Sequence, residues 1–401
     1  MNRHRRNPTN CGVVIAMAVA IMMTGARAQA QETGINVGGF TLRGTQELVG
    51  TYTRYGDSSS DFSARLDSEA SAQSNWARHE LRFETSLSST VPRPASGKLI
   101  DEMSATLTGR LDISEQTILE ISTTASRSYD NDPDSDRGSD VSVPGSDDSY
   151  GASARLSHTF GVVGVEVEGG VSREEFGAQQ LAGGATEIRS DQNRWVYNGR
   201  ARVRYAGGGR LQPFIEGRYQ LSAPDALADS NGVNRRWRGI SGLLGVAYGG
   251  DEDPLSAEIA GGYGRAMFDE PTYSNASVWL AEASIRWAPT ERQAVTARVA
   301  TSFDLSDDPA VSTVISRSAA IGVEQALGAR IEAGAEIEAE LETYQGSSRR
   351  DTVVTVSGDI AYLFTDRISA LLRSSYIRRY SNESSNRDSQ FEVGAGVRIR
   401  Y

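Results

Sequence analysis

The amino-acid sequence predicts an all-β protein, a transmembrane antiparallel up-and-down β-barrel of about 18 strands, from three observations. Apolar and polar residues alternate in segment after segment, which is the period of a strand with two different faces. Short and long connections also alternate along the chain, as in a barrel with short turns at one end and longer loops at the other. The hydrophobic fraction is 38% of 401 residues, which is low for a soluble domain.

The first 30 residues predict a cleaved signal peptide, and residues 31–401 predict the barrel domain. Arg3, Arg5 and Arg6 form a basic head, residues 13–23 are an uncharged apolar run, and small residues that suit cleavage end at Ala28 or Ala30. This run is too short for a helix across a membrane, which needs roughly 20 residues. The first 30 residues hold four arginines and no acid, so residues 31–401 carry a net charge of −15 against −11 for the whole chain.

Composition excludes several classes of function. The single cysteine, Cys11, rules out a disulfide framework or a cysteine-ligated metal site. The acidic balance argues against binding to nucleic acid, which requires a basic surface. Lys98 is the only lysine among the 41 basic residues, so positive charge is carried by arginine. We expect no cofactor and no bound metal.

The alternation is clearest in residues 194–205, 330–342 and 391–401. In the last of these the apolar face holds Phe391, Val393, Ala395, Val397, Ile399 and Tyr401. Successive side chains of a strand point to opposite faces, so charged residues share the other face. That face supplies the candidates for a pore lining, which are Arg200, Arg202, Arg204, Glu332, Glu336, Glu338, Glu340, Glu342, Arg373, Arg398 and Arg400.

The connections predict the strand count. Eight short connections alternate with nine longer polar ones, and these 17 connections join 18 strands. Sixteen strands is the alternative, because residues 62–74 and 313–325 alternate weakly. Residues 31–401 then provide about 21 residues per strand and connection, enough for a membrane strand of roughly 9–11 residues. The short connections lie near residues 74–77, 113–116, 161–164, 207–210, 249–254, 288–292, 328–330 and 364–367.

Aromatic residues recur close to the short turns on the apolar face. Rings of this kind collect at the level of lipid head groups, so they predict an aromatic girdle in contact with outer-membrane lipid. The alternative explanation is the ordinary preference of Tyr and Trp for strands. The girdle candidates are Tyr205, Tyr248, Trp287, Tyr362 and Tyr401.

A secreted soluble β-sandwich is the alternative fold. Its second face would also have to form a dry core, which the charged face cannot do because unpaired buried charge is too costly. A barrel with lipid outside and water inside satisfies both faces, and its closure removes the exposed sheet edges.

Three stretches resemble a family of proteobacterial outer-membrane β-barrels known as β-barrel porin type 2: residues 74–83 (SNWARHELRF), residues 109–113 (GRLDI) and residues 375–382 (SYIRRYSN). The resemblance implies a porin-like barrel in the outer membrane of a Gram-negative bacterium. Some members of that family resemble proteins tied to the export of extracellular or capsular polysaccharide. The terminal Tyr401 is similar to the signal that the barrel-assembly machinery reads, which would make this machinery a partner.

A passive or weakly selective pore for small hydrophilic solutes is the function we expect, because barrels of this size enclose an aqueous channel. Charged ladders in the lumen would tune ion preference, or they would pair with one another and only solvate the interior. Residues 131–149 form the third long loop. In general porins the third loop folds into the channel and narrows it, so by that resemblance this loop is a candidate for the constriction. The alternative is a solvated surface loop. The constriction candidates are Asp132, Asp134, Asp136 and Asp140.

An enzyme and a calcium site are both disfavoured. Ser157 and His158 are adjacent in a predicted strand and therefore face opposite sides, so they cannot act together as nucleophile and base. An EF-hand counted from Asp132 fails, because Arg137 stands where Gly is needed.

Loop carboxylates could still bridge to lipopolysaccharide through weakly held cations. Polysaccharide export is the alternative function. The oligomeric state is left open.

Overall fold

The computed structural model describes residues 34–56, 59–91, 100–129, 141–181, 183–229, 232–250, 253–305 and 311–401. Within these residues the chain forms one closed sheet of long antiparallel strands. The predicted signal peptide lies outside them. No helix in this part of the chain is long and apolar enough to cross a membrane.

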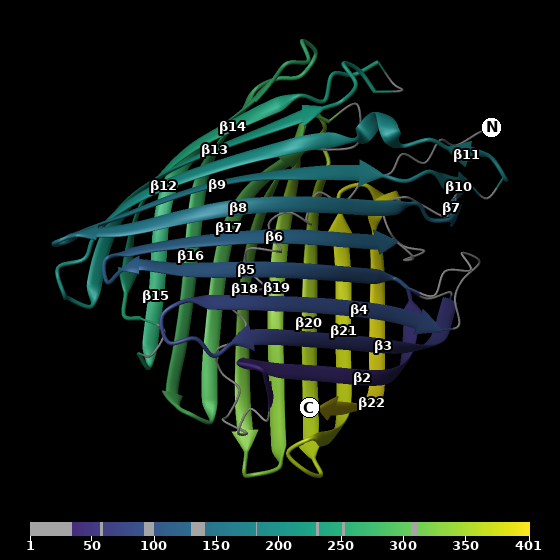
Figure 1. Ribbon diagram of the computed structural model, residues 1–401. Helices are drawn as coiled ribbons and strands as arrows, with labels where there is room; N and C mark the ends of the chain where they lie inside the picture. The colour runs from purple at the N-terminus through teal and green to yellow at the C-terminus, as the bar shows by residue number, and fades with distance from the viewer. Residues whose placement is uncertain are drawn as a thin grey trace.

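Eighteen long strands build the wall, as the sequence predicts. They are β2 (Phe40–Tyr55), β3 (Ser59–Ser74), β4 (Glu80–Val91), β5 (Glu102–Ser114), β6 (Thr117–Tyr129), β8 (Ser146–Phe160), β9 (Val163–Phe176), β12 (Arg194–Tyr205), β13 (Leu211–Pro224), β14 (Trp237–Tyr248), β15 (Leu255–Phe268), β16 (Ala276–Thr290), β17 (Gln293–Leu305), β18 (Thr313–Leu327), β19 (Ile331–Gln345), β20 (Arg350–Leu363), β21 (Ile368–Ser381) and β22 (Asp388–Arg400). In Figure 1, β2 to β9 form the nearer wall and β15 to β22 pass behind them.

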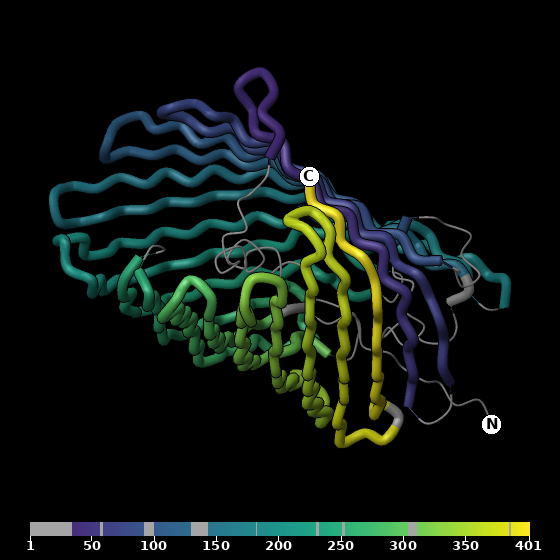
Figure 2. The backbone as a smooth tube through the Cα atoms, turned by 90° about the horizontal axis from the view of Figure 1, so that it is seen from below, coloured from purple at the N-terminus to yellow at the C-terminus, as the bar shows by residue number. Residues whose placement is uncertain are grey.

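The sheet closes where its last strand meets its first. β22 pairs with β2 in an antiparallel register from Thr45↔Arg400 to Tyr55↔Gln390. Figure 2 shows the yellow end of the chain running beside the purple first strand. Closure leaves no open sheet edge between these two strands, which is the condition for a β-structure that spans a lipid bilayer.

The short turns fall at the predicted positions. They join β5 to β6, β8 to β9, β12 to β13, β18 to β19 and β20 to β21, among others. Several contain glycine in the left-handed region, where a side chain would be strained; Gly161 has φ 60° and Gly328 has φ 77°. The β2–β3 connection, predicted as one of the longer ones over residues 56–60, spans only residues 56–58 because β3 begins at Ser59.

Four short strands and two 3-10 helices, η2 (Ser190–Gln192) and η3 (Ser384–Asn386), accompany the wall. β1 (Ile35–Val37) pairs with the start of β2. β7 (Val141–Val143) pairs with β10 (Gln179–Leu181), which pairs with β11 (Thr186–Glu187). The loop after β6 and the loop after β9 thereby share a small sheet, which lies beyond the ends of β8 and β9 in Figure 1.

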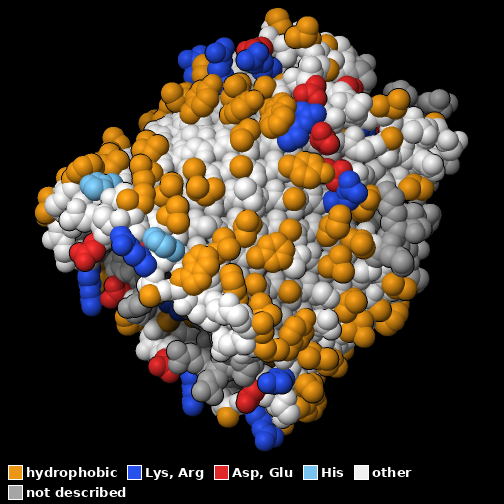
Figure 3. All heavy atoms as spheres, viewed as in Figure 1, with side chains coloured by type: hydrophobic (Ala, Val, Ile, Leu, Met, Phe, Trp, Pro, Cys, Tyr) orange, Lys and Arg blue, Asp and Glu red, His pale blue; other side chains and the backbone are white. Residues whose placement is uncertain are grey.

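The two faces of the wall differ in chemistry. The outer face exposes large apolar side chains, and in Figure 3 charged side chains lie mainly toward its margins. The opposite side chains form ion pairs that bridge strands several positions apart; Arg202 on β12 reaches Glu258 on β15. Side chains on distant strands can converge in this way only on the concave side of a closed sheet. The charged face is therefore the inner face.

One part of the wall splits and doubles back inside the barrel. β15 pairs with β16 as far as Ala266↔Ala276. Among the described residues, the pairing of β16 with β17 stops at Ala283↔Val299, although β17 stays paired with β18 as far as Leu305↔Thr313. Beyond Val299, β17 separates from β16 but stays paired with β18, which itself remains paired with β19 from Thr313↔Gln345 onward. We call residues 300–305 and 313–316 the infold.

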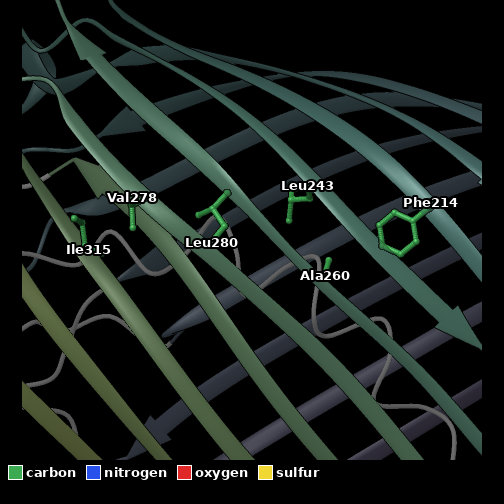
Figure 4. Packing of buried hydrophobic residues seen from close by; sticks show 6 residues of the cluster. All are labelled: Phe214, Leu243, Ala260, Val278, Leu280 and Ile315. Atoms are coloured by element: carbon green, nitrogen blue, oxygen red, sulfur yellow. The ribbon is translucent and has the colours of Figure 1, made fainter.

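The infold packs its outer face against the inner face of β13 to β16. Ile315 belongs to one buried cluster with Phe214, Leu243, Ala260, Val278 and Leu280, which Figure 4 shows in a row across the strands. Phe303 packs against this cluster and meets the Trp237 ring edge-on at 6.0 Å. A side chain on Gly239 or Gly264 would collide with the Phe303 ring, at 3.2 Å and 2.9 Å. These two glycines make room for Phe303.

Exposure confirms that the infold has left the outer surface. On β18, Ile315 is 5% exposed, whereas Ile321, six residues along the same face, is 50% exposed. On β14 the neighbours Leu243 and Leu244 differ in the same way, at 2% and 68%. Leu244 faces outward, and the infold covers Leu243.

The assignment of faces makes a direct prediction for β6. Ile121 lies on the outer face and Ser122 on the inner face, where it is within 3.3 Å of the Thr108 hydroxyl. We expect Ile121→Arg to lower the free energy of unfolding from lipid vesicles by about 2–4 kcal/mol, and Ser122→Arg to lower it far less. Urea unfolding of both variants provides the comparison. Equal destabilisation by the two substitutions would contradict the assignment.

Candidate channel lining

Glu216 is the centre of an ion-pair network on the inner wall. It lies on β13, its side chain is 0% exposed, and it accepts hydrogen bonds from three guanidinium groups. Its Oε2 atom is 2.8 Å from Arg200 Nε and 2.5 Å from Arg202 Nε, and its Oε1 atom is 2.5 Å from Arg218 Nε. Burying this carboxylate is tolerable because three opposite charges surround it.

The network extends along the wall in both directions. Arg202 binds Glu258 through two hydrogen bonds of 2.8 Å, and Arg218 binds Glu282 at 2.6 and 2.8 Å. Bidentate ion pairs of this kind fix both side chains in one geometry. In the other direction Arg200 reaches Glu166 at 2.9 Å. The remaining members are Glu168, Arg155 and Glu120, so the network crosses from β6 to β16.

The outer members of the network are accessible to solvent. The side chains of Arg155, Glu120 and Glu258 are each about 40% exposed, at 40%, 38% and 38%. Long charged side chains keep this exposure only where water reaches them. Water therefore reaches the inner wall at these three side chains.

β19 carries an acidic ladder with fewer partners. Glu336 pairs with Arg298 at 2.8 Å, Glu342 with Arg379 at 3.0 Å, and Glu332 with Arg400 at 3.6 Å. Glu338 and Glu340, on the same face of β19, form no ion pair with any described residue. These two carboxylates leave a net negative field along this part of the wall.

A third charged group lies at the seam where the barrel closes. Glu47 on β2 binds both Arg373 on β21 and Arg398 on β22. These ion pairs tie the first strand to the last two. They also line a polar cavity of about 680 Å³ together with Arg65, Asp359 and Glu392.

Pairs of hydroxyl groups lie between the charged residues on the inner face of β4 to β6. Ser86 lies 2.7 Å from Ser104, Thr106 lies 3.2 Å from Thr124, and Thr108 lies 3.3 Å from Ser122. Each pair bridges neighbouring strands on the inner face. These pairs add uncharged hydrogen-bond donors and acceptors to the inner wall.

Near the loop end, Asp351 forms a buried cluster with two arginines. It accepts hydrogen bonds from Arg349 and, at 3.3 Å, from Arg379. Tyr344 donates to Glu342 at 2.8 Å, and the Arg349 guanidinium lies over its ring at 4.4 Å. This cluster fixes the β19–β20 connection.

Two carboxyl groups in the loops beyond the strands have lowered pKa values. Two hydrogen bonds from Arg173, of 2.6 and 2.7 Å, lower the pKa of Asp225. The backbone N–H groups of Asn234 and Thr272 lower the pKa of Glu270. Both groups therefore stay negative at neutral pH and hold their loops through those contacts.

The chain matches the family described as Putative beta-barrel porin 2 over residues 27–401. It belongs to this family. Membership implies a location in the outer membrane of a Gram-negative bacterium. No curated protein matches the chain.

Several solved outer-membrane barrels are similar in shape. OpdL of Pseudomonas aeruginosa aligns with 12% identity and a TM-score of 0.47, covering 91% of this chain and 99% of OpdL. OccK2 (OpdF) of the same species has 9% identity and a TM-score of 0.47, with 90% and 98% coverage. OccAB4 of Acinetobacter baumannii has 10% identity and a TM-score of 0.46, with 93% and 99% coverage.

The residues predicted to line the pore fall into paired and unpaired groups in this porin-family barrel. Arg200, Arg202, Arg373 and Arg398 are bound to glutamates, as the pairing alternative expected for lumen charges. Arg204 is exposed near the short turns and donates to Gln212 at 3.4 Å. The structure does not assemble the predicted arginines into a separate positive wall.

The other predicted residues have different outcomes. The four constriction candidates, at positions 132, 134, 136 and 140, lie outside the described residues. Tyr205, Trp287, Tyr362 and Tyr401 are exposed on the outer face, and Tyr248 is half-buried. Their contact with lipid head groups stays a prediction. His158 lies 2.7 Å from the Thr117 hydroxyl and packs on Phe160.

Glu216, Glu47 and the covered apolar residues of the inner wall were not predicted from the sequence. Glu216 and Glu47 follow the same alternation as the predicted residues, so that pattern could have found them. The inner apolar patch also leaves a signal, because Leu243 and Leu244 on β14 and residues 278–280 on β16 are apolar on both faces of their strands.

Removal of the central carboxylate tests the network. We expect Glu216→Gln to lower the free energy of unfolding by about 3–5 kcal/mol, because three guanidinium groups lose their shared partner. Glu166→Gln is the matched control, since Glu166 is partly exposed and Arg200 keeps Glu216; its expected cost is below about 1 kcal/mol. Denaturant unfolding measures both. A cost for Glu216→Gln as small as the control would show that the network does not hold the wall together.

Proposed function

We propose that the protein is a porin-like channel of the outer membrane, through which small hydrophilic solutes diffuse passively with weak selectivity. The observation that carries this proposal is the closed 18-strand barrel whose inner face bears charged and hydroxyl side chains that reach water. Barrels of 16–18 strands enclose an aqueous passage. Family membership agrees with this function.

The balance of paired and unpaired groups favours a weak preference for cations. In the Glu216 network four arginines bind six glutamates, and at the seam Arg373 and Arg398 share Glu47. Glu338 and Glu340 have no such partner among the described residues. Rings and ladders of uncompensated carboxylates attract cations into a pore.

Planar-bilayer recording tests both statements. Purified protein should give stepwise ion currents. In a salt gradient their reversal potential should shift toward the equilibrium potential of the cation. Silence at high voltage and high salt would reject the channel. A second test deletes the gene in the bacterium. If the deletion lowers the amount of surface polysaccharide and leaves small-solute uptake unchanged, it would support the export alternative.

Neutralising the unpaired acids should reduce the preference for cations. We expect Glu338→Gln combined with Glu340→Gln to lower the cation-to-anion permeability ratio by roughly half, since the field along β19 weakens. Glu291→Gln combined with Asp366→Asn makes the same change of charge in two exposed short turns and should leave the ratio nearly unchanged. Equal effects of the two double substitutions would show that selectivity arises from overall charge rather than from β19.

A further inference from the structure

We propose that the infold is the element that narrows this channel, a role that rests on the proposed channel function. Residues 300–305 of β17 and 313–316 of β18 lie inside the barrel, against the inner face of β13 to β16. They add a second layer to the wall, held by a dry apolar contact. The passage is narrowed by this folded part of the wall itself.

The first support is the chemistry of the wall that the infold covers. Most of the inner face carries carboxylates, guanidinium groups and hydroxyls. On β13 to β16 it also carries an apolar patch of buried residues beside Glu216, Glu258 and Glu282; the patch consists of Phe214, Leu243, Ala260, Val278 and Leu280. An apolar patch of this size facing a water-filled lumen would be unfavourable. The patch is consistent with a permanent cover, and Ile315 and Phe303 provide it.

The second support is the space that the infold takes up. Stacked sheets lie about 10 Å apart, and a strand rises about 3.3 Å per residue. The infold therefore brings a second layer about 10 Å inside the wall, over about 20 Å for the six residues 300–305. A second layer of that thickness must reduce the cross-section open to solutes.

The third support is what borders the infold. Ser316 on the infold is paired with Glu342 of the acidic ladder in the β18–β19 register. On the other side, the Arg202 guanidinium lies over the Phe214 ring at 4.0 Å, so the Glu216 network adjoins the covered patch. A solute that passes the infold must therefore pass groups that carry charge, which couples width to ion preference.

A cysteine reporter tests whether the infold covers the wall in a membrane. The only cysteine is Cys11, within the predicted signal peptide, so a single reporter is read against a cysteine-free barrel. We expect Leu243→Cys in lipid vesicles to react with a membrane-impermeant thiol reagent at least about tenfold more slowly than Thr106→Cys, an inner-face control on β5 that the infold does not cover. Leu280→Cys is the second reporter if the first variant does not fold.

Weakening the contact then tests the role in conduction. Phe303→Ser combined with Ile315→Ser should expose the reporter thiol at position 243 to the reagent and raise single-channel conductance by roughly twofold. Val299→Ser combined with Ile321→Ser changes two residues on the same strands that remain on the outer face, and it should leave both readouts unchanged. If the first double variant does not fold, Gly264→Leu displaces the Phe303 ring instead.

Each result decides one part of the proposal. Labelling at position 243 as fast as labelling at position 106, with the infold unaltered, would overturn the cover, whatever the currents show. If Phe303→Ser combined with Ile315→Ser makes the thiol at position 243 react faster but leaves the conductance unchanged, the narrowing role is overturned. Absence of current in every variant would reject the channel function itself, while the labelling still reports whether the cover exists.

Discussion

Closure of the sheet between β2 and β22 is the constraint on which the rest of the structure depends. A strand inside a bilayer has no water to satisfy its backbone, so an unpaired edge would cost several kcal/mol for each group. The register from Thr45↔Arg400 to Tyr55↔Gln390 removes that edge. Once the sheet is closed, each residue faces either lipid or the lumen, and the period of two becomes a division between two solvents.

The inner wall then divides into regions according to what touches each one. Where water reaches, as at Arg155 and Glu120, charges stay partly exposed and their pairing costs little. Where water is excluded, as at Glu216, three guanidinium groups replace it. Where the wall is apolar, as at Leu243, another part of the wall covers it. The glycines at positions 239 and 264 show that this last contact is fitted at the level of single side chains.

Alternation made the barrel predictable from the sequence. Lipid outside favours apolar residues and water inside favours polar ones, so the two kinds alternate along each strand. The strand count and the short turns followed from it, including the weakly alternating segments 62–74 and 313–325. The pairing of Arg200 with Glu216 was not predictable in detail, since it depends on the register between β12 and β13. The infold was missed because Phe303 and Ile315 keep the parity of the outer face. A sequence pattern gives the face of a residue in its own strand, and it does not reveal that a strand end has moved to the opposite side of the wall.

Alternate residues of each strand face a water-filled lumen in this barrel, and a cysteine scan along β6 is the sharpest test of that arrangement. Residues 121–126 are replaced by cysteine one at a time and treated with a membrane-impermeant thiol reagent in lipid vesicles. We expect fast labelling at positions 122, 124 and 126 and slow labelling at 121, 123 and 125. Labelling without this period of two, or slow labelling at all six positions, would contradict it.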